Sequence, residues 1–355
     1  MSPGSTATTG DGSFWSGELD YLLPESLIAQ SPAARREQSR LMVLDRDGGV
    51  AAHSVFSHLG DFLPSGALLV ANDSRVFPAR LRGHKEDSGG AVEALLLGVG
   101  RGGIAPAMVR VAKPLRIGQS IVFAGGLRAK VFSEPSRGRV SLDFGEVDLV
   151  EALGRVGEVP LPPYIGRVDG PSDEDRERYQ TVYARSPGSV AAPTAGLHFT
   201  AELIADLRAG GFDFATVTLH VGPGTFTPVR GTLAEHEMET ETYDIPAEVA
   251  ESVRAAKAAG RAVVAIGTTT VRALESAVDE GGRLRPGAGD TRLFIRPGHR
   301  FAVIDALVTN FHLPGSTLLA LVMALAGRDT VRAAYEDAVR SGYRFYSFGD
   351  AMLIR

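Results

Sequence analysis

The strongest constraint on the fold is a change of pattern along the chain. Between about residues 66 and 148, short apolar segments follow one another closely and are broken by Gly, Pro and charged turns, which is typical of a small antiparallel barrel or sandwich. After Asp148, helical periods such as 247–259 alternate with apolar strands such as 262–266 and 301–307, which is typical of a sheet covered by helices. The sequence therefore predicts an α/β protein, in which a mixed-sheet α/β main domain carries an inserted antiparallel β-barrel domain.

The domain boundaries are predicted from the same change. Residues 1–12 are small, polar and aperiodic, so we expect a flexible tail. Residues 13–65 and 149–355 are assigned to one discontinuous α/β catalytic domain, and residues 66–148 to the inserted barrel. The first strand of the insert is expected at the apolar run 67–71.

Composition excludes several classes of protein. With 44% hydrophobic and 22% charged residues, the chain has the make-up of a folded globular protein rather than a disordered one. It holds no run of about 18 apolar residues and no secretory leader, so we expect a cytoplasmic protein without a membrane partner. No Cys is present, which excludes disulfides, thiolate metal sites and cysteine nucleophiles. The formal net charge of -5 argues against indiscriminate nucleic-acid binding but allows a local basic face.

A run of small residues ending in a histidine is the densest unusual stretch. Residues 188–200 place Thr194 and His198 just ahead of a predicted helix start at Thr200. Backbone N–H groups near a helix N-terminus can receive a phosphate or a carboxylate. The alternative is a tight turn in which His198 makes a buried hydrogen bond.

A glycine turn follows the next predicted strand. The strand delivers His220, and Gly222 and Gly224 would let a ligand approach the backbone closely. The turn lacks the full G-x-G-x-x-G pattern of a dinucleotide fold. A glycine hairpin without a ligand therefore remains open as the alternative.

An acidic cluster holding one imidazole spans residues 235–241. On a helix, His236 and Glu239 would share one face, as a base with its orienting carboxylate or as two metal ligands would. Thr240 stands where the second histidine of an H-E-x-x-H zinc helix would be, so we expect no metal. A solvated acidic surface is the alternative interpretation.

Two further polar clusters follow predicted strands. Three threonines at 268–270 lie where a strand gives way to a helix, a place suited to capping and to ligand contacts. Arg272 and Glu275 would share a face of that helix, where a plain salt bridge is the simple account. The segments 309–317 and 343–350 combine aromatic and polar residues and would serve either as core or as a surface on which bases stack.

A set of short strings runs through the chain from about Leu19 to the C-terminus. The strings are LPESLIAQ at 23–30, NDSRV at 72–76, PPYI at 162–165, YQTVY at 179–183, APTAGLHF at 192–199, TLHV at 218–221, GTT at 267–269 followed by VR at 271–272, TNFHLP at 309–314 and GDAM at 349–352. Together and in this order, they resemble the S-adenosylmethionine:tRNA ribosyltransferase-isomerase family of queuosine biosynthesis.

The resemblance implies a fold and a reaction. The fold is an α/β domain built from both ends of the chain, with a β-barrel inserted between them. The reaction uses S-adenosylmethionine as a ribosyl donor, and its acceptor is 7-aminomethyl-7-deazaguanine at the wobble position of a tRNA with a queuosine-type anticodon. Epoxyqueuosine-tRNA forms while adenine and methionine are released. We therefore expect S-adenosylmethionine as co-substrate, tRNA as partner, and a monomeric enzyme.

The resemblance also implies a set of site residues. The catalytic candidates are His198, His220, His312 and His236. The candidates for binding the donor are Thr194, Gly222, Gly224, Thr225, Thr268, Thr269, Arg272 and Asn310. The candidates for contact with the RNA or its modified base are Arg75, Arg80, Arg344 and Tyr346. Which imidazole acts as base and which as acid stays open.

One departure from the family leaves the acceptor open. Where the family has His-x-Met-His-x-Glu, this chain has Glu239 in place of the second histidine. A carboxylate cannot donate as a neutral imidazole does, and it adds negative charge where RNA phosphate would approach. A diverged paralogue that uses a free 7-deazapurine or another small acceptor is therefore the first alternative. The others are a conventional methyltransferase, supported by the turn at 221–224, and a non-catalytic RNA-binding module.

Overall fold

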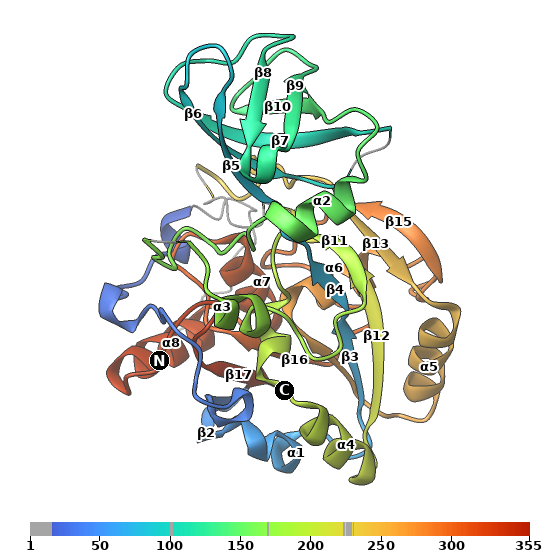
Figure 1. Ribbon diagram of the computed structural model, residues 1–355. Helices are drawn as coiled ribbons and strands as arrows, with labels where there is room; N and C mark the ends of the chain where they lie inside the picture. The colour runs from blue at the N-terminus through green and yellow to red at the C-terminus, as the bar shows by residue number, and fades with distance from the viewer. Residues whose placement is uncertain (1–15, 100–101, 169, 223, 225–228, 230) are drawn as a thin grey trace.

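Figure 1 shows a large sheet covered by helices and a smaller barrel beyond one end of it. The computed structural model describes residues 16–99, 102–168, 170–222, 224, 229 and 231–355. The strands of the large sheet are β1 (Arg40–Asp45), β2 (Gly49–Val55), β3 (Leu68–Asn72), β12 (Asp213–Leu219), β13 (Glu241–Ile245), β14 (Val263–Ile266), β15 (Gly287–Thr291), β16 (Ala306–Asn310) and β17 (Ala351–Ile354). The helices packed on it are α1 (Leu59–Phe62), α4 (Ala201–Ala209), α5 (Ala247–Ala258), α6 (Thr268–Ser276), α7 (Thr317–Ala326) and α8 (Arg328–Arg340).

The large sheet is mixed. Within the described residues its nine strands follow the order β15-β13-β12-β3-β14-β16-β17-β1-β2. The central strands β12, β3, β14 and β16 are parallel neighbours, and β1 runs parallel to β17. The remaining pairs are antiparallel.

Side chains of the central strands alternate between two hydrophobic cores. On β14, Val263 and Ala265 join the core built with α5, α6, α7 and α8. Val264 and Ile266 point the other way, into the core built with α1 and α4. Because both faces are covered, every residue of β3, β14 and β16 is buried, without the alternation of a one-sided strand.

The barrel is a separate closed body. Its strands are β5 (Arg80–Lys85), β6 (Ala91–Leu96), β7 (Ile104–Val111), β8 (Ser120–Phe123), β9 (Arg128–Val131) and β10 (Arg139–Asp143). They close in the order β10-β7-β6-β5-β8-β9. Buried and less buried positions alternate along them, as Val92, Ala94 and Leu96 of β6 show. The predicted fold class, a mixed-sheet α/β domain with an inserted antiparallel β-barrel, is confirmed.

Both edges of the insert differ from the prediction. The run expected at 67–71 forms β3, which lies in the middle of the main sheet between β12 and β14. All five residues of β3 are buried, as in a strand covered on both faces, whereas barrel strands alternate. At the other edge, helix α2 (Leu149–Val156) packs Leu149, Ala152 and Leu153 into the barrel core. The predicted boundary at 148/149 thus assigns α2 to the main domain, although the helix packs on the barrel.

Two local predictions are also wrong. Residues 236–240 have no regular secondary structure and lead directly into β13, so His236 and Glu239 do not share a helical face. The strand expected at 301–307 begins only at Ala306. By contrast, α5 begins at the predicted residue and ends one residue before the predicted end, and α4 begins one residue after the predicted start at Thr200.

Glu275 ties α6 to the loop before β16 instead of pairing with Arg272. Its carboxylate is almost fully buried and accepts hydrogen bonds from the backbone N–H groups of Ala302, Val303 and Ile304 at 2.9, 3.0 and 3.1 Å. The predicted salt bridge on one helix face is therefore wrong, because the side chain turns to buried backbone donors that need an acceptor.

Replacing this carboxylate should destabilise the main domain. We expect Glu275→Ala to lower the free energy of unfolding by roughly 3–5 kcal/mol, because three backbone N–H groups, two of them buried, lose a charged acceptor. Urea unfolding followed by circular dichroism measures the change. Glu251→Ala, which removes an exposed carboxylate from α5, is the control and should leave the midpoint unchanged. Equal shifts in the two variants would contradict the assigned role of Glu275.

Candidate active site

A pocket opens at the carboxyl ends of the parallel strands β14 and β16. In open α/β sheets, ligands bind in the crevice beyond such strand ends. The pocket and its open mouth together contain about 700 Å³ of space not filled by protein atoms. Its lining comes from the segments 192–195, 267–269, 309–313 and 346–347, together with Tyr164, Val221, Ser316 and Leu318.

Two threonines stand where α6 begins, at the edge of the pocket. They follow Gly267, whose φ of +88° is strained for any residue with a side chain. Thr269 Oγ1 accepts a hydrogen bond from Asn72 Nδ2 at 3.1 Å, and Thr268 lines the pocket beside it. No described side chain caps the N-terminus of α6, so its first N–H groups can serve a ligand.

Asn310, the last residue of β16, presents a hydrogen-bond acceptor without a partner. Its Nδ2 donates to the backbone oxygen of Tyr346 at 3.0 Å and to Nε2 of His198 at 3.2 Å. Its Oδ1 is buried and has no partner among the described residues. Because an unpaired buried carbonyl oxygen is costly, a ligand group that carries an N–H or O–H donor fits this part of the pocket.

His198 lies behind Asn310 and does not line the pocket. Its Nε2 accepts from Asn310, which assigns the ring proton to Nδ1, and Nδ1 donates to Ser39 Oγ at 2.7 Å. Burial lowers the pKa of His198 to about 3, and the positive charge of Arg344 adds to the shift. The neutral ring therefore orients the Asn310 amide. These contacts fit the alternative given above, a tight turn in which His198 makes a buried hydrogen bond.

Of the four predicted histidines, which are all described, His312 alone lines the pocket. Its Nε2 lies 2.8 Å from Thr309 Oγ1. Its backbone is fixed by two tyrosines, because its N–H donates to Tyr335 Oη at 3.1 Å and its carbonyl accepts from Tyr21 Oη at 2.5 Å. Burial lowers the pKa of His312 to about 3, so the imidazole is neutral at pH 7.

Tyr346 and Tyr164 form an aromatic wall of the pocket. Their ring centroids are 3.9 Å apart, with the planes inclined by 59°. Tyr346 has a φ of +75°, a left-handed conformation that costs a residue with a side chain about 1 kcal/mol or more. Its backbone is held there because its N–H donates to Phe311 at 3.1 Å and its carbonyl accepts from Asn310. Strain of this kind concentrates at functional sites.

The predicted glycine turn borders the pocket through Val221. The N–H of Gly222 donates to Glu241 Oε1 at 2.9 Å, and the other oxygen of Glu241 forms a buried ion pair with Arg272. Arg272 and Gly222, which were predicted to bind the donor, do not line the pocket. In the described contacts, Arg272 fixes the turn by holding the carboxylate that binds it.

Glu239 connects the end of this turn to the barrel. It packs against Gly224, where an added Cβ would meet Glu239 carbon atoms at 2.6 Å. Its carboxylate forms an ion pair with Arg139 of β10. The residue that replaces the family's histidine is thus a contact between the two domains. Thr225, the next predicted position, lies outside the described residues.

His220 and His236 lie outside the pocket lining. The ring of His220 packs against Gly188, where a Cβ would come within 2.9 Å of it. Its Nδ1 is buried with no partner in the described part of the chain, and burial lowers its pKa while the charge of Asp73 opposes the shift. The ring of His236 meets Phe294 edge-on, with centroids 5.3 Å apart, and burial lowers its pKa as well.

Of the residues predicted to contact RNA, Tyr346 lines the pocket and the arginines do not. Arg75 is exposed on β4 (Ser74–Val76), which pairs with β11 (Ser186–Ser189). Arg80 lies at the start of the barrel, where its Nη2 donates to the backbone oxygen of Leu161 at 2.9 Å.

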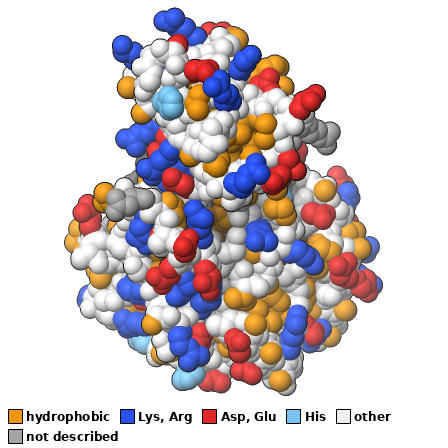
Figure 2. All heavy atoms as spheres, viewed as in Figure 1, with side chains coloured by type: hydrophobic (Ala, Val, Ile, Leu, Met, Phe, Trp, Pro, Cys, Tyr) orange, Lys and Arg blue, Asp and Glu red, His pale blue; other side chains and the backbone are white. Residues whose placement is uncertain are grey.

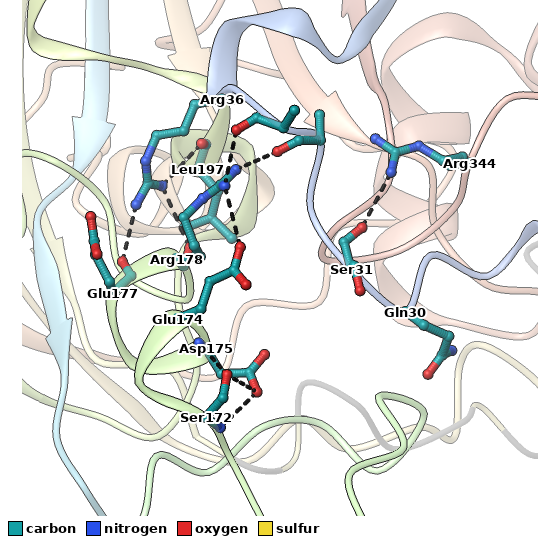
Figure 3. Close-up of polar contacts among 12 residues, drawn as sticks. Gln30, Ser31, Arg36, Ser172, Glu174, Asp175, Glu177, Arg178, Leu197 and Arg344 are labelled. Atoms are coloured by element: carbon teal, nitrogen blue, oxygen red, sulfur yellow. Dashed lines mark hydrogen bonds and ion pairs between the residues drawn. The ribbon is translucent and has the colours of Figure 1, made fainter.

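Arg344 belongs to a group of arginines that donate hydrogen bonds to backbone carbonyl oxygens (Figure 3). Arg344 donates to the backbone oxygen of Ser31 at 3.2 Å, and Arg36 donates to that of Leu197 at 3.1 Å. Arg178, at the end of α3 (Asp173–Arg178), donates to the backbone carbonyls of residues 33 and 34. Burial and then the charge of Arg178 lower the pKa of Arg36. Their bonds hold the N-terminal segment against α3 and the turn at His198.

Sequence reasoning found part of this site and missed part of it. The predicted residues that the structure brings together in the pocket lining are Thr194, Thr268, Thr269, Asn310, His312 and Tyr346. Tyr164 and Ser347 also line it, and Tyr164 had a signal because it stands in the PPYI string. Ser39, which orients His198, had none, because 159 residues separate the two.

Two kinds of site are absent from the part of the chain that the structure describes. No group of three or more His, Cys, Asp or Glu side chains is placed to hold a metal ion. No described helix has the length and apolar character needed to cross a membrane. The polar groups that do line the pocket are hydroxyls, an amide and an imidazole.

The fold and the pocket define a two-domain α/β protein with a small-ligand site beyond its parallel strands. The family model described as queuosine biosynthesis protein matches residues 16–354, and the chain belongs to this family. The S-adenosylmethionine:tRNA ribosyltransferase-isomerase of Anaeromyxobacter sp. (strain Fw109-5) is 54% identical over 343 residues, which cover 95% of this chain and 98% of that protein. The protein of the same name from Nitratidesulfovibrio vulgaris (strain DP4) is 50% identical, covering 95% and 96%.

A solved structure agrees with these relatives. The crystal structure of S-adenosylmethionine tRNA ribosyltransferase from Thermotoga maritima has 36% sequence identity and a TM-score of 0.53 to this chain. The match covers 95% of this chain and 100% of the other. The resemblance inferred from the sequence motifs is therefore confirmed.

The burial of His312 makes stability depend on pH. An unfolded histidine has its ordinary pKa of 6.5, whereas the folded value is about 3. The unfolded chain therefore takes up the proton first, so this stability is complete above about pH 6.5 and is lost as the pH falls toward 3. Between about pH 7.5 and about pH 5, we expect the wild type to lose about 2 kcal/mol more than His312→Gln. Urea unfolding at both pH values tests this, and equal losses would contradict a neutral buried ring.

Proposed function

We propose that this protein transfers and isomerises the ribosyl moiety of S-adenosylmethionine onto 7-aminomethyl-7-deazaguanine at the tRNA wobble position. The products are epoxyqueuosine-tRNA, adenine and methionine. The observation that carries the proposal is a polar-edged pocket beyond β14 and β16, in a chain that matches relatives named for this activity over 95% of its length. Because its acceptor is tRNA, the enzyme acts in the cytoplasm.

The chemistry of the pocket suits S-adenosylmethionine. The donor carries hydroxyl and amino groups that donate hydrogen bonds, and Asn310 Oδ1 is a buried acceptor without a partner in the described residues. The hydroxyl of Thr268 and the uncapped start of α6 provide donors for its negatively charged carboxylate. The ring faces of Tyr346 and Tyr164 favour a positively charged sulfonium. These residues would hold the donor.

His312 is the histidine placed for proton transfer. The sulfonium of the donor acidifies the neighbouring ribose hydrogens, so the reaction needs a base, and the leaving adenine needs an acid. The Nε2 atom of His312 is engaged with Thr309, which leaves Nδ1 for this work. Because burial lowers its pKa to about 3, the ring is unprotonated at pH 7 and gives up a proton readily once it has accepted one. Asn310 and His198 position the groups around it.

The contact of Glu239 bears on the choice of acceptor. A free carboxylate beside the site would repel RNA phosphate and favour a small acceptor. In this chain, Glu239 is paired with Arg139 of the barrel, so its charge is compensated. We therefore favour tRNA over a free 7-deazapurine, which remains the alternative that the assay below distinguishes.

The experiment is a chromatographic assay with S-adenosylmethionine and either tRNA carrying 7-aminomethyl-7-deazaguanine or the free base. We expect adenine and methionine to be released with the tRNA, together with a matching gain of mass on the anticodon nucleoside. His312→Gln should lower kcat by about 100-fold or more, because it removes the proton carrier. His58→Gln, which changes an exposed histidine outside the pocket lining, is the control and should keep wild-type rates.

Three outcomes would contradict the proposal in different ways. Adenine release with the free base alone would favour the small-acceptor paralogue. S-adenosylhomocysteine in place of adenine would favour a methyltransferase. Binding of tRNA without consumption of the donor would favour a non-catalytic RNA-binding module.

A further inference from the structure

Charge is divided unequally between the two domains. Residues 80–143, which hold the barrel strands, contain 11 Lys and Arg against 5 Asp and Glu, whereas the whole chain contains 37 against 42. The rest of the chain therefore carries 26 basic and 37 acidic side chains. An acidic protein thus carries a strongly basic barrel, and Figure 2 shows Lys and Arg side chains standing out over the barrel on the face in view.

The basic residues of the barrel gather on neighbouring strands. Arg82 of β5 lies opposite Glu93 of β6, and Glu93 lies opposite Arg110 of β7. Two residues before Arg110, Met108 lies opposite Arg139 of β10, so Arg110 and Arg139 share the outer face. We name the exposed arginines of this face, together with one in the turn before β10, the basic stripe: Arg82, Arg110, Arg137 and Arg139.

Two arginines of the basic stripe form no ion pair with the described residues. Among the described residues, no ion pair involves Arg110 or Arg137, and both side chains are exposed. Glu93 is the cross-strand neighbour of Arg110, but its carboxylate pairs with Arg80, whose Nε lies 3.5 Å from Oε1. Two positive charges, one on β7 and one in the turn before β10, therefore face solvent without an ion-pair partner from the described residues, a setting that suits phosphate groups.

The basic stripe crosses the barrel, and one of its two ends reaches the region of the site. At one end Arg82 pairs with Glu158 at 3.2 Å, beyond the barrel. At the other end Arg139 pairs with Glu239. Glu239 packs on Gly224 of the turn that borders the pocket. The stripe therefore forms a path across the barrel that ends beside the glycine turn.

We propose that the basic stripe binds the sugar–phosphate backbone of the tRNA whose wobble nucleotide enters the pocket. Binding of nucleic acid without sequence readout is mostly neutralisation of phosphates by Lys and Arg, and arginine forms bidentate bonds with phosphate oxygens. Glu239 occupies Arg139 in the free protein, so it competes with the phosphate at that end. This inference rests on the proposed function, because it takes the tRNA as the acceptor.

The test is a titration of tRNA by fluorescence anisotropy at several salt concentrations. We expect the double variant Arg110→Gln/Arg137→Gln to bind tRNA about tenfold more weakly at about 0.1 M salt. The slope of log Kd against log salt should fall by about 2, roughly 1 for each lost phosphate contact. The control removes the same charge from exposed arginines of α8, as Arg332→Gln/Arg340→Gln, and should bind as the wild type does.

A third variant tests the opposite direction. Glu239→Gln frees Arg139, so we expect it to bind tRNA about threefold more tightly and to steepen the salt dependence. Weaker binding by Glu239→Gln, or equal losses in the barrel and α8 variants, would overturn the proposal. Circular dichroism checks that the variants are folded, and exposed Arg→Gln changes leave the barrel core untouched.

Steady-state kinetics separates this inference from the proposed function. If the wild type releases adenine with tRNA, we expect the Arg110/Arg137 variant to raise KM for tRNA about tenfold and to leave kcat and KM for S-adenosylmethionine unchanged. An unchanged KM for tRNA in an otherwise active enzyme would overturn the stripe alone. If the wild type releases no adenine, the proposed function fails, and the anisotropy titration still decides whether the stripe binds tRNA.

Discussion

The side-chain amide of Asn72 holds together the place where sheet, barrel and pocket meet. Asn72 ends β3 and is fully buried. Its Nδ2 donates to the backbone oxygen of Leu219 at 2.9 Å and to Thr269 Oγ1, and its Oδ1 accepts from the N–H groups of Leu219 and Ser74, both at 3.0 Å. The side chain thus continues the pairing with β12 after the backbone leaves the sheet for the barrel. The same bonds fix the start of α6 at the pocket.

Much of the fold could be predicted, because local patterns decide it. The alternation of helical periods and apolar runs after Asp148 gave the covered sheet, and the close turns before it gave the barrel. The exception was β3, since an apolar run of five residues has the same composition in either domain. Its partners β12 and β14 lie more than 140 residues further along the chain, so its position depends on tertiary packing that no local pattern contains.

The part of the site that lies at strand ends or within sequence motifs could be predicted from the sequence. Thr268 follows β14, Asn310 ends β16 and His312 follows it. The rule that ligands bind beyond parallel strand ends therefore brings these residues together. The partners that set their properties are distant in sequence. Neither the link from His198 to Asn310, 112 residues apart, nor the buried pair of Glu241 with Arg272 could be read from spacing. Burial lowers the pKa of His198 and of His312 to about 3, and burial is a property of the folded chain.

We propose that the pocket beyond β14 and β16 holds the ribosyl donor. A crystal structure of the protein with S-adenosylmethionine tests this most directly. We expect electron density for the adenosyl group between Thr268, Asn310 and Tyr346, with a donor group of the ligand within hydrogen-bonding distance of Asn310 Oδ1. Density at the turn of Gly222 and Gly224, with the pocket empty, would contradict it.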